Sequence, residues 1–140
     1  MNKGFDGLIS KVNDCSLKKV AVAVAQDEPV LEAIRAAKER NIADAILVGD
    51  KSKIEEIAKA INMDLSTYEI IDEPDDFQAA LKAVELVHNK KADMYMKGLI
   101  DTKSFLKSIL DKNVGLRTGK PLSHVAVFEV KGIEQLLFLT

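Results

Sequence analysis

The sequence contains few of the side chains that bind metals or form disulfides. It has one cysteine, Cys15, and two histidines, His88 and His124, among 140 residues. One cysteine cannot form an intrachain disulfide, and this set supplies too few ligands for a zinc site. We therefore predict no metal site and interpret Cys15 as an inert thiol.

Long apolar runs and an excess of one charge are also missing. The longest apolar run, residues 20–25, is far shorter than the ~20 residues that a membrane-spanning helix needs. The first residues lack the apolar core of a signal peptide. A net charge of −2 leaves no basic surface for nucleic acid. These features predict a cytoplasmic protein without a membrane segment or a nucleic-acid partner.

The apolar residues that are present follow two alternating patterns, in a composition typical of a globular domain (47% apolar, 30% charged). Short apolar runs indicate buried strands at residues 19–25, 45–48, 68–72 and 93–96. Apolar residues at helical spacing indicate helices at residues 5–12, 27–37, 52–61, 73–87 and 102–112. Strand–helix units in series predict a parallel sheet with helices on both faces, because parallel strands need right-handed crossovers.

Two of the predicted helices begin with residues that favour helix starts. Asp27 can cap free N–H groups and Pro29 fits the first turn. Ser52 and Glu55 have the spacing of a capping box.

The end of the sequence breaks the strand–helix rhythm. Residues 124–130 and 134–140 form two apolar runs, and the three residues between them are too few for a crossover. We predict an antiparallel hairpin, and hence an α/β fold: a mostly parallel three-layer sheet with helices on both faces, a mixed edge and this terminal hairpin. An apolar run without a polar tail means that the last strand is covered within the chain or that the chain is a fragment.

The loops after the predicted strands are the candidate binding loops, because ligands of open α/β sheets bind beyond the carboxyl ends of the strands. These loops are residues 26–28, 49–50, 72–74 and 97–102. The last one combines a cation (Lys97), a glycine (Gly98), and Asp101 and Thr102 at a helix start, a combination that suits a phosphate group. It is neither a Walker A loop nor a GxGxxG fingerprint. Alternatively, Asp101 or Thr102 caps the helix, Gly98 permits a turn and Lys97 faces water.

A second polar segment follows the last predicted helix. It contains two cations, Arg117 and Lys120, together with Thr118, Ser123 and His124. Arginine binds phosphate oxygens in a bidentate manner and hydroxyls add donors. The plainer alternative is a polar connecting loop, with His124 as a structural residue at a strand start. No nucleophile–base arrangement is visible, so the catalytic residues stay unassigned.

Three segments together resemble the phosphate acetyl/butyryltransferase family, and within it the phosphate butyryltransferases. They are residues 96–102 (MKGLIDT), 114–119 (VGLRTG) and 122–128 (LSHVAVF). The segment at residues 20–29, a strand followed by Gln-Asp-Glu-Pro, fits the same family. The resemblance covers most of the chain and is specific over residues 97–128.

The resemblance implies an architecture and a reaction. Family members are about twice this length and have two α/β domains of the isocitrate/isopropylmalate dehydrogenase type, with the active site between them. Residues 1–140 would then be the N-terminal domain of a two-domain phosphate acyltransferase, with the second half absent. The reaction implied is butyryl-CoA + phosphate = butyryl phosphate + CoA. Coenzyme A is a substrate and no tightly bound cofactor is implied; the full-length enzyme is expected to be a homo-oligomer.

The same resemblance implies roles for the polar loops. Lys97, Gly98, Asp101 and Thr102 would line the phosphate end of the cleft. The residues expected to face the same cleft, and to complete the substrate-binding set, are Arg117, Thr118, Ser123 and His124. The family's base region lies in the absent half, so no base is named.

Two other functions are compatible with the residues. A stand-alone α/β module for a phosphate-bearing small molecule would be monomeric and would unfold cooperatively, whereas a truncated domain would expose apolar surface and self-associate. A dehydrogenase of the same architecture is disfavoured by the lack of a dinucleotide fingerprint.

Overall fold

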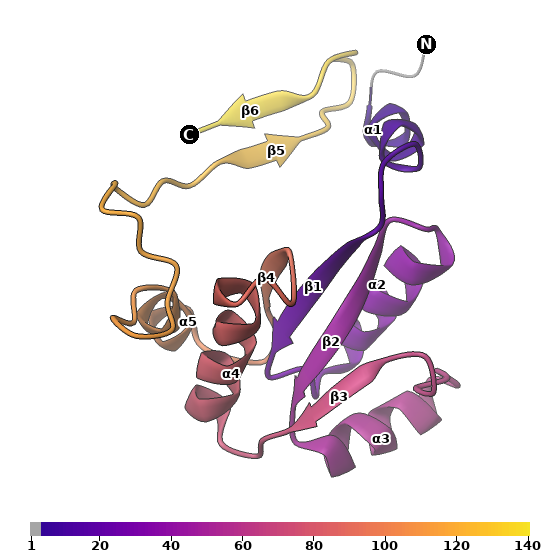
Figure 1. Cartoon of the computed structure of the whole chain (residues 1–140). Helices are drawn as coiled ribbons and strands as arrows, with labels where there is room; N and C mark the ends of the chain where they lie inside the picture. The colour runs from indigo at the N-terminus through magenta and orange to yellow at the C-terminus, as the bar shows by residue number, and fades with distance from the viewer. Residues whose placement is uncertain (1–3) are drawn as a thin grey trace. The chain divides into compact units, whose positions relative to one another are not determined.

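The chain divides into two compact units in the computed structural model, which describes residues 4–140 (Figure 1). The larger unit is Leu17–Arg117 and contains the parallel sheet. The smaller unit combines Met1–Ser16 with Thr118–Thr140.

Strands and helices alternate strictly in the larger unit. In chain order they are β1 (Lys18–Ala23), α2 (Glu28–Glu39), β2 (Ala43–Gly49), α3 (Lys51–Ala60), β3 (Glu69–Asp72), α4 (Asp76–His88), β4 (Met94–Lys97) and α5 (Thr102–Ile109). The strands form one sheet in the order β3-β2-β1-β4, and every pairing is parallel. In this register Val22 of β1 lies between Leu47 of β2 and Met96 of β4. The predicted parallel sheet is confirmed.

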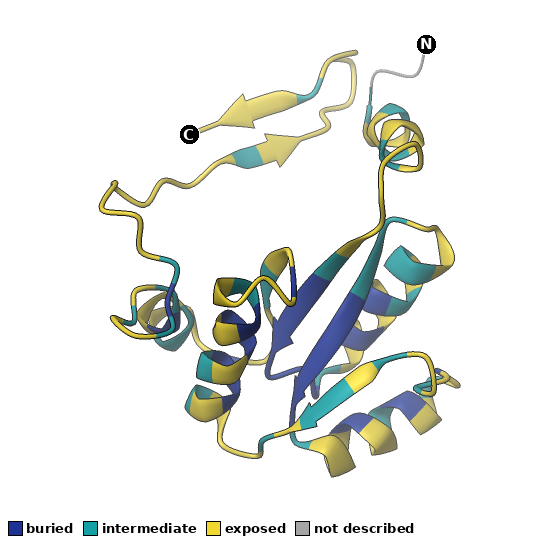
Figure 2. Cartoon of the chain, viewed as in Figure 1, coloured by how far each residue is buried: buried dark blue, intermediate teal, exposed yellow. Residues whose placement is uncertain are grey.

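Helices cover both faces of the sheet, and β1, one of its two inner strands, is buried on both (Figure 2). Val20 and Val22 contribute to the apolar cluster that holds Leu31 of α2 and Ile54 of α3. Ala21 and Ala23 point to the other face, where the cluster contains residues of α4. Successive strand residues point to opposite faces, which is why β1 reads as an unbroken apolar run. The predicted three-layer arrangement is confirmed.

The direction of the chain through the sheet reverses at β1. From β1 the chain moves to β2 and β3 through α2 and α3, which lie on one face. Helix α4 then carries it back along the other face to β4, on the far side of β1. The loops after β1 and β4 therefore diverge toward opposite faces. Such a switch point is where open α/β sheets bind their ligands.

The start of α3 corrects one prediction. The N-cap is Asp50, whose carboxylate accepts the backbone N–H of Lys53 at 3.2 Å, and Ser52 lies inside the helix. The predicted capping box is wrong because β2 runs on through Gly49, so the residue directly after the strand becomes the cap. Asp27 is the N-cap of α2, as predicted, and Pro29 lies in its first turn, although the Asp27 side chain makes no capping bond.

The smaller unit consists of α1 (Phe5–Val12), as predicted, and an antiparallel hairpin of β5 (Ala126–Phe128) and β6 (Leu137–Leu139). The Glu129 carboxylate accepts the backbone N–H of Phe5 at 2.7 Å. The predicted hairpin is confirmed, but its strands are shorter than residues 124–130 and 134–140. The predicted mixed edge is wrong, because within residues 4–140 the strands β5 and β6 pair with each other in a separate two-stranded sheet.

Several general features concern the described residues alone. Within residues 4–140, no cluster of three or more His, Cys, Asp or Glu side chains is arranged to hold a metal ion. None of the helices in this range has the length and apolar character needed to cross a bilayer. Cys15 is exposed and unpaired with another cysteine.

Candidate functional site

The loop after β4 is held tightly against the end of β1. The backbone N–H of Gly98 donates to the Ala23 carbonyl and that of Leu99 to the Val24 carbonyl, both at 2.8 Å. A Cβ atom on Gly98 would overlap these two carbonyl oxygens. Gly98 is therefore required for the close approach of two backbones, and its N–H is already used inside the fold.

Lys97, the last residue of β4, is exposed at the switch point. Its Nζ lies 3.5 Å from the Gly98 carbonyl oxygen. None of the ion pairs formed among residues 4–140 includes Lys97. The ammonium group is therefore available to an anion beyond the carboxyl end of the sheet.

The start of α5 is already capped by a carboxylate. Asp101 is the N-cap residue and accepts the backbone N–H of Ser104 at 2.8 Å. Hydrogen bonds from Ser104 lower the pKa of this carboxyl below its ordinary value. The interpretation of Asp101 as a cap is confirmed. An anion at this helix end would compete with Asp101, whereas the exposed hydroxyl-bearing residue Thr102 follows directly in the first turn.

A tight turn after α5 leads to Arg117. The Asp111 carboxylate accepts the N–H groups of Asn113 at 2.8 Å and Val114 at 3.0 Å, which lowers its pKa. The Gly115 carbonyl lies 2.9 Å from Nδ1 of His88, which ties the turn to α4. Arg117 is exposed at the end of this anchored segment. The predicted helix 102–112 ends earlier, at Ile109, because this turn replaces its last residues.

The other predicted site residues lie in the smaller unit. Thr118, Ser123 and His124 are all exposed there. His124 precedes β5 by two residues, so the predicted strand start at His124 is wrong. The structure thus brings together Lys97, Gly98, Asp101 and Thr102 in one loop, with Arg117 in the same unit.

The sequence placed Gln26 in a candidate binding loop, but it gave no individual role to Gln26 or to Val24, which both follow β1. Val24 is fully buried and has a positive φ of 58°, an outlier for a β-branched residue. Gln26 is only 7% exposed, and its Oε1 accepts the Asp50 N–H at 3.2 Å. The signal available in the sequence was a polar glutamine directly after an apolar strand.

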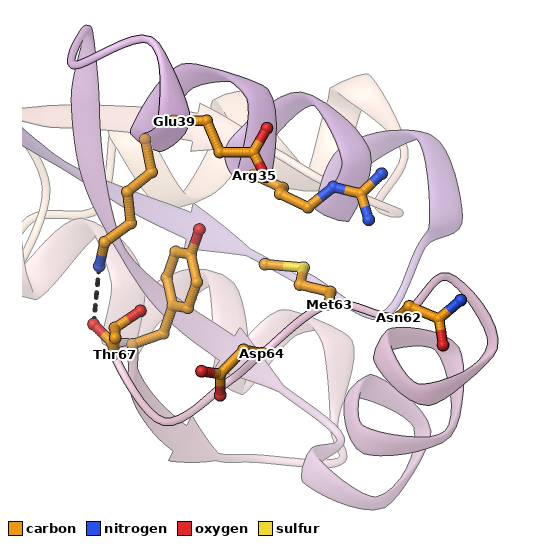
Figure 3. Close-up of a pocket in the computed structure, with 8 residues that line it drawn as sticks. Arg35, Glu39, Asn62, Met63, Asp64 and Thr67 are labelled. Carbon is orange, nitrogen blue, oxygen red and sulfur yellow. Dashed lines mark hydrogen bonds between the residues drawn. The ribbon is translucent and has the colours of Figure 1, made fainter.

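A pocket of about 330 Å³ lies at the other end of the sheet, between the end of α2 and the segment before β3 (Figure 3). Its cations are engaged by the fold. Arg35 donates to the Ile61 carbonyl at 2.7 Å, and Lys38 donates to the Thr67 carbonyl at 2.8 Å. The Lys38 Nζ also lies 4.2 Å from the centre of the Tyr68 ring. The pocket is distant in topology from the predicted loops, because it adjoins the amino ends of the strands.

Comparison with known proteins assigns the family. The model of the family described as "Phosphate acetyl/butaryl transferase" matches residues 5–80. The chain belongs to this family. The resemblance drawn from residues 96–128 is thereby confirmed by a different part of the sequence.

Named relatives of this transferase family cover the whole chain. This chain is 64% identical over 140 residues to the phosphate butyryltransferase of Clostridium beijerinckii and 61% identical to that of Clostridium acetobutylicum. Each match covers 100% of this chain and 46% of the relative. The chain spans about half the length of the curated relatives it matches.

A solved structure supports the fold of this family member. The EutD phosphotransacetylase from Staphylococcus aureus matches with a TM-score of 0.68 and 20% identity, over 95% of this chain and 49% of that chain. At this identity the likeness concerns the fold alone. The predicted α/β class is confirmed.

Proposed function

We propose that the chain provides the first domain of a two-domain phosphate acyltransferase that catalyses butyryl-CoA + phosphate = butyryl phosphate + CoA. The observation that carries this proposal is the 64% identity to a phosphate butyryltransferase across all 140 residues. Lys97 supports the proposal, because it is an exposed cation at the switch point of the sheet, where open α/β sheets bind their ligands.

The chain's own residues act on the phosphate in this proposal. When a thiolate attacks the acyl carbonyl, negative charge develops on the departing phosphate, and fixed cations lower the barrier. Lys97 and Arg117 supply these cations. The remaining proposed substrate-binding residues shape the loop or add donors: Gly98, Asp101, Thr102, Thr118, Ser123 and His124. Because the Gly98 N–H is bound to Ala23, Gly98 contributes by shaping the loop.

Thiol deprotonation requires a base, and none of these residues is assigned that role. We therefore propose that the base belongs to the part of the enzyme outside this chain, and that residues 1–140 alone do not turn over substrate. Coenzyme A acts as a substrate and not as a tightly bound cofactor. The full-length enzyme is proposed to be a cytoplasmic homo-oligomer.

The test is a chimera in which this chain replaces the matched part of the Clostridium beijerinckii relative. Lys97→Ala and Arg117→Ala should each raise the KM for butyryl phosphate or lower kcat by about tenfold or more, because each removes a charge-assisted phosphate contact. Lys59→Ala is the matched control, since Lys59 is exposed in the last turn of α3. An inactive chimera that is folded, or near-normal kinetics in both variants, would contradict the proposal.

A further inference from the structure

We propose that Gln26 is a substrate-binding residue whose side-chain Nε2 donates a hydrogen bond to an uncharged carbonyl oxygen of the substrate. This inference rests on the proposed function and extends it, because it assigns the recognition of a carbonyl group to the loop after β1. The phosphate group stays with Lys97.

The first observation is a half-satisfied buried amide. Gln26 is 93% buried, since only 7% of it is exposed, and its Oε1 accepts the backbone N–H of Asp50 at 3.2 Å. This bond fixes which end of the amide is oxygen, because a backbone N–H must face an acceptor. The two hydrogens on Nε2 have no partner among the hydrogen bonds formed within residues 4–140. No fully buried side-chain nitrogen in this range lacks a partner, so Nε2 keeps access to solvent.

The second observation is that the backbone around Gln26 is strained and firmly held. The N–H of Asp27 donates to the Ala25 carbonyl at 2.8 Å, which makes Gln26 the centre of a three-residue turn. Val24, just before this turn, has the unfavourable φ of 58°. Such strain persists where neighbouring structure imposes it, and it gathers at functional sites.

Hydrogen bonds to β2 and to the loop after β4 hold this conformation. The N–H of Ala25 donates to the Val48 carbonyl of β2 at 3.0 Å, while the Val24 carbonyl accepts the Leu99 N–H from the loop after β4. The turn is thus connected to the strands on either side of β1. It lies at the switch point, where the loops after β1 and β4 diverge.

The third observation is that the amide needs the room a glycine leaves. A Cβ atom on Gly49 would overlap Oε1 of Gln26. The end of β2 therefore accommodates the glutamine side chain against its backbone. The Gln26 amide therefore has space beside Gly49, an Oε1 held by the Asp50 N–H and an Nε2 free to donate. These are the properties of a preorganised ligand contact.

The surrounding charges select an uncharged acceptor. Two carboxylate-bearing residues adjoin the Gln26 amide. Asp27 follows Gln26 in the turn, and Asp50 donates its backbone N–H to the Gln26 side chain. Among the ion pairs formed by residues 4–140, Lys53 pairs with Asp50 at 3.4 Å and none includes Asp27. Residual negative charge disfavours a phosphate at this point, whereas a carbonyl oxygen accepts from an amide N–H without that penalty. The acyl carbonyl and the amide carbonyls of the pantetheine arm both offer this chemistry.

A purely structural role for Gln26 predicts different behaviour. Its Oε1 alone would then matter, because it links the loop after β1 to β2. Gln26→Glu separates the two roles: a carboxylate oxygen still accepts the Asp50 N–H, but the Nε2 donor is replaced by a second acceptor. Gln135→Glu makes the same change at an exposed position of the smaller unit and is the matched control.

The experiment is NMR of the side-chain amides of this chain, with butyryl phosphate, pantetheine and inorganic phosphate as separate probes. The inference predicts a saturable shift of the Gln26 amide with butyryl phosphate or pantetheine, which also identifies the source of the carbonyl, and none with inorganic phosphate. Gln26→Glu should weaken binding of the responding probe about fivefold or more, as expected for one lost hydrogen bond. Gln135→Glu should not. Binding is compared at a temperature where both variants are folded, because a buried carboxylate at position 26 beside Asp27 and Asp50 lowers the melting temperature.

Other outcomes overturn the inference. A Gln26 amide silent to both carbonyl probes, or one that responds equally to inorganic phosphate, contradicts carbonyl recognition. Unchanged binding in Gln26→Glu contradicts it as well. If the chimera turns over butyryl phosphate while Gln26 stays silent, the inference fails and the proposed function survives; an inactive, folded chimera counts against the proposed function instead.

Discussion

Gly98 donates its backbone N–H to the carbonyl of Ala23 at 2.8 Å, and the two backbones lie so close that a Cβ atom on Gly98 would overlap that carbonyl oxygen. This contact joins the loop that follows Lys97 to the end of the inner strand β1. The position of the proposed phosphate-binding loop therefore depends on a residue without a side chain.

Gly98→Ala should accordingly lower the free energy of unfolding by about 1–3 kcal/mol, the usual cost of forcing an extra carbon into a packed site. Urea denaturation measures this change. Leu99→Ala is the control, because Leu99 is 54% exposed and its truncation should change stability by about 0.5 kcal/mol or less. Equal effects of the two substitutions would mean that the contact does not constrain the loop.

The cap of α3 gives a second prediction. Asp50→Ala should destabilise the protein by about 1 kcal/mol, because it removes the acceptor for the Lys53 N–H. Ser52→Ala should be neutral or slightly stabilising, since Ser52 lies inside the helix, where alanine is favoured. Thermal unfolding of the two variants compares them directly. If Ser52→Ala lowered the stability more than Asp50→Ala, Ser52 would be the cap, as the capping box predicted from the sequence requires.

Tyr95 makes stability depend on alkaline pH. Its hydroxyl lies 2.8 Å from Ser108 Oγ, and burial raises the pKa of Tyr95 to about 12. An unfolded tyrosine titrates near a pKa of about 10. The unfolded chain therefore loses this proton first, so the Tyr95 contribution is complete below about pH 10 and declines as the pH rises toward 12.

Tyr95→Phe should remove this component. Urea denaturation of the wild type and the variant at about pH 9 and about pH 11 isolates it, because the lysines titrate in both proteins. The variant should be the less stable protein at the lower pH, by about 0.5–1.5 kcal/mol for the lost hydrogen bond. The difference in free energy of unfolding between the wild type and the variant should be smaller at the higher pH. A disadvantage that is constant or grows with pH would contradict the raised pKa.

The hairpin of the smaller unit leaves apolar side chains in contact with water. Phe138 is 66% exposed and Leu139 is 59% exposed. Exposed apolar patches promote association, so this chain should self-associate and bind a hydrophobic dye. Phe138→Ser should reduce both effects more than Leu17→Ser, which removes an exposed apolar side chain from the larger unit. Sedimentation measures the association and dye fluorescence measures the binding. A monomeric chain that does not bind the dye would contradict this prediction.

The sequence predicted most of the larger unit because its elements are encoded locally. The run at residues 19–25 has the composition of a strand buried on both faces, and β1 is such a strand. Element ends were less accurate where two residues compete for one role. Asp50 and Ser52 are both good caps, and the choice between them depends on how far β2 continues.

The remaining features depend on contacts between distant residues. The positive φ of Val24 occurs where the Ala25 N–H donates to the Val48 carbonyl and the Leu99 N–H donates to the Val24 carbonyl, contacts that no local pattern encodes. The same holds for the strand order β3-β2-β1-β4 and for the burial of Gln26 against Gly49. The sequence predicted the connection between β4 and α5 at residues 97–102, and the binding role of this loop stays a prediction. The sequence could not show that the Gly98 N–H is used internally.

A backbone-amide NMR titration of the 140-residue chain with butyryl phosphate and then coenzyme A tests whether this chain carries the phosphate-binding loop. We expect saturable shifts concentrated at residues 97–102 and around Arg117, while the amides lining the pocket of Arg35 and Tyr68 stay unchanged. A well-dispersed spectrum in which residues 97–102 do not respond to either compound would contradict the claim that this chain carries the phosphate-binding loop of an acyltransferase.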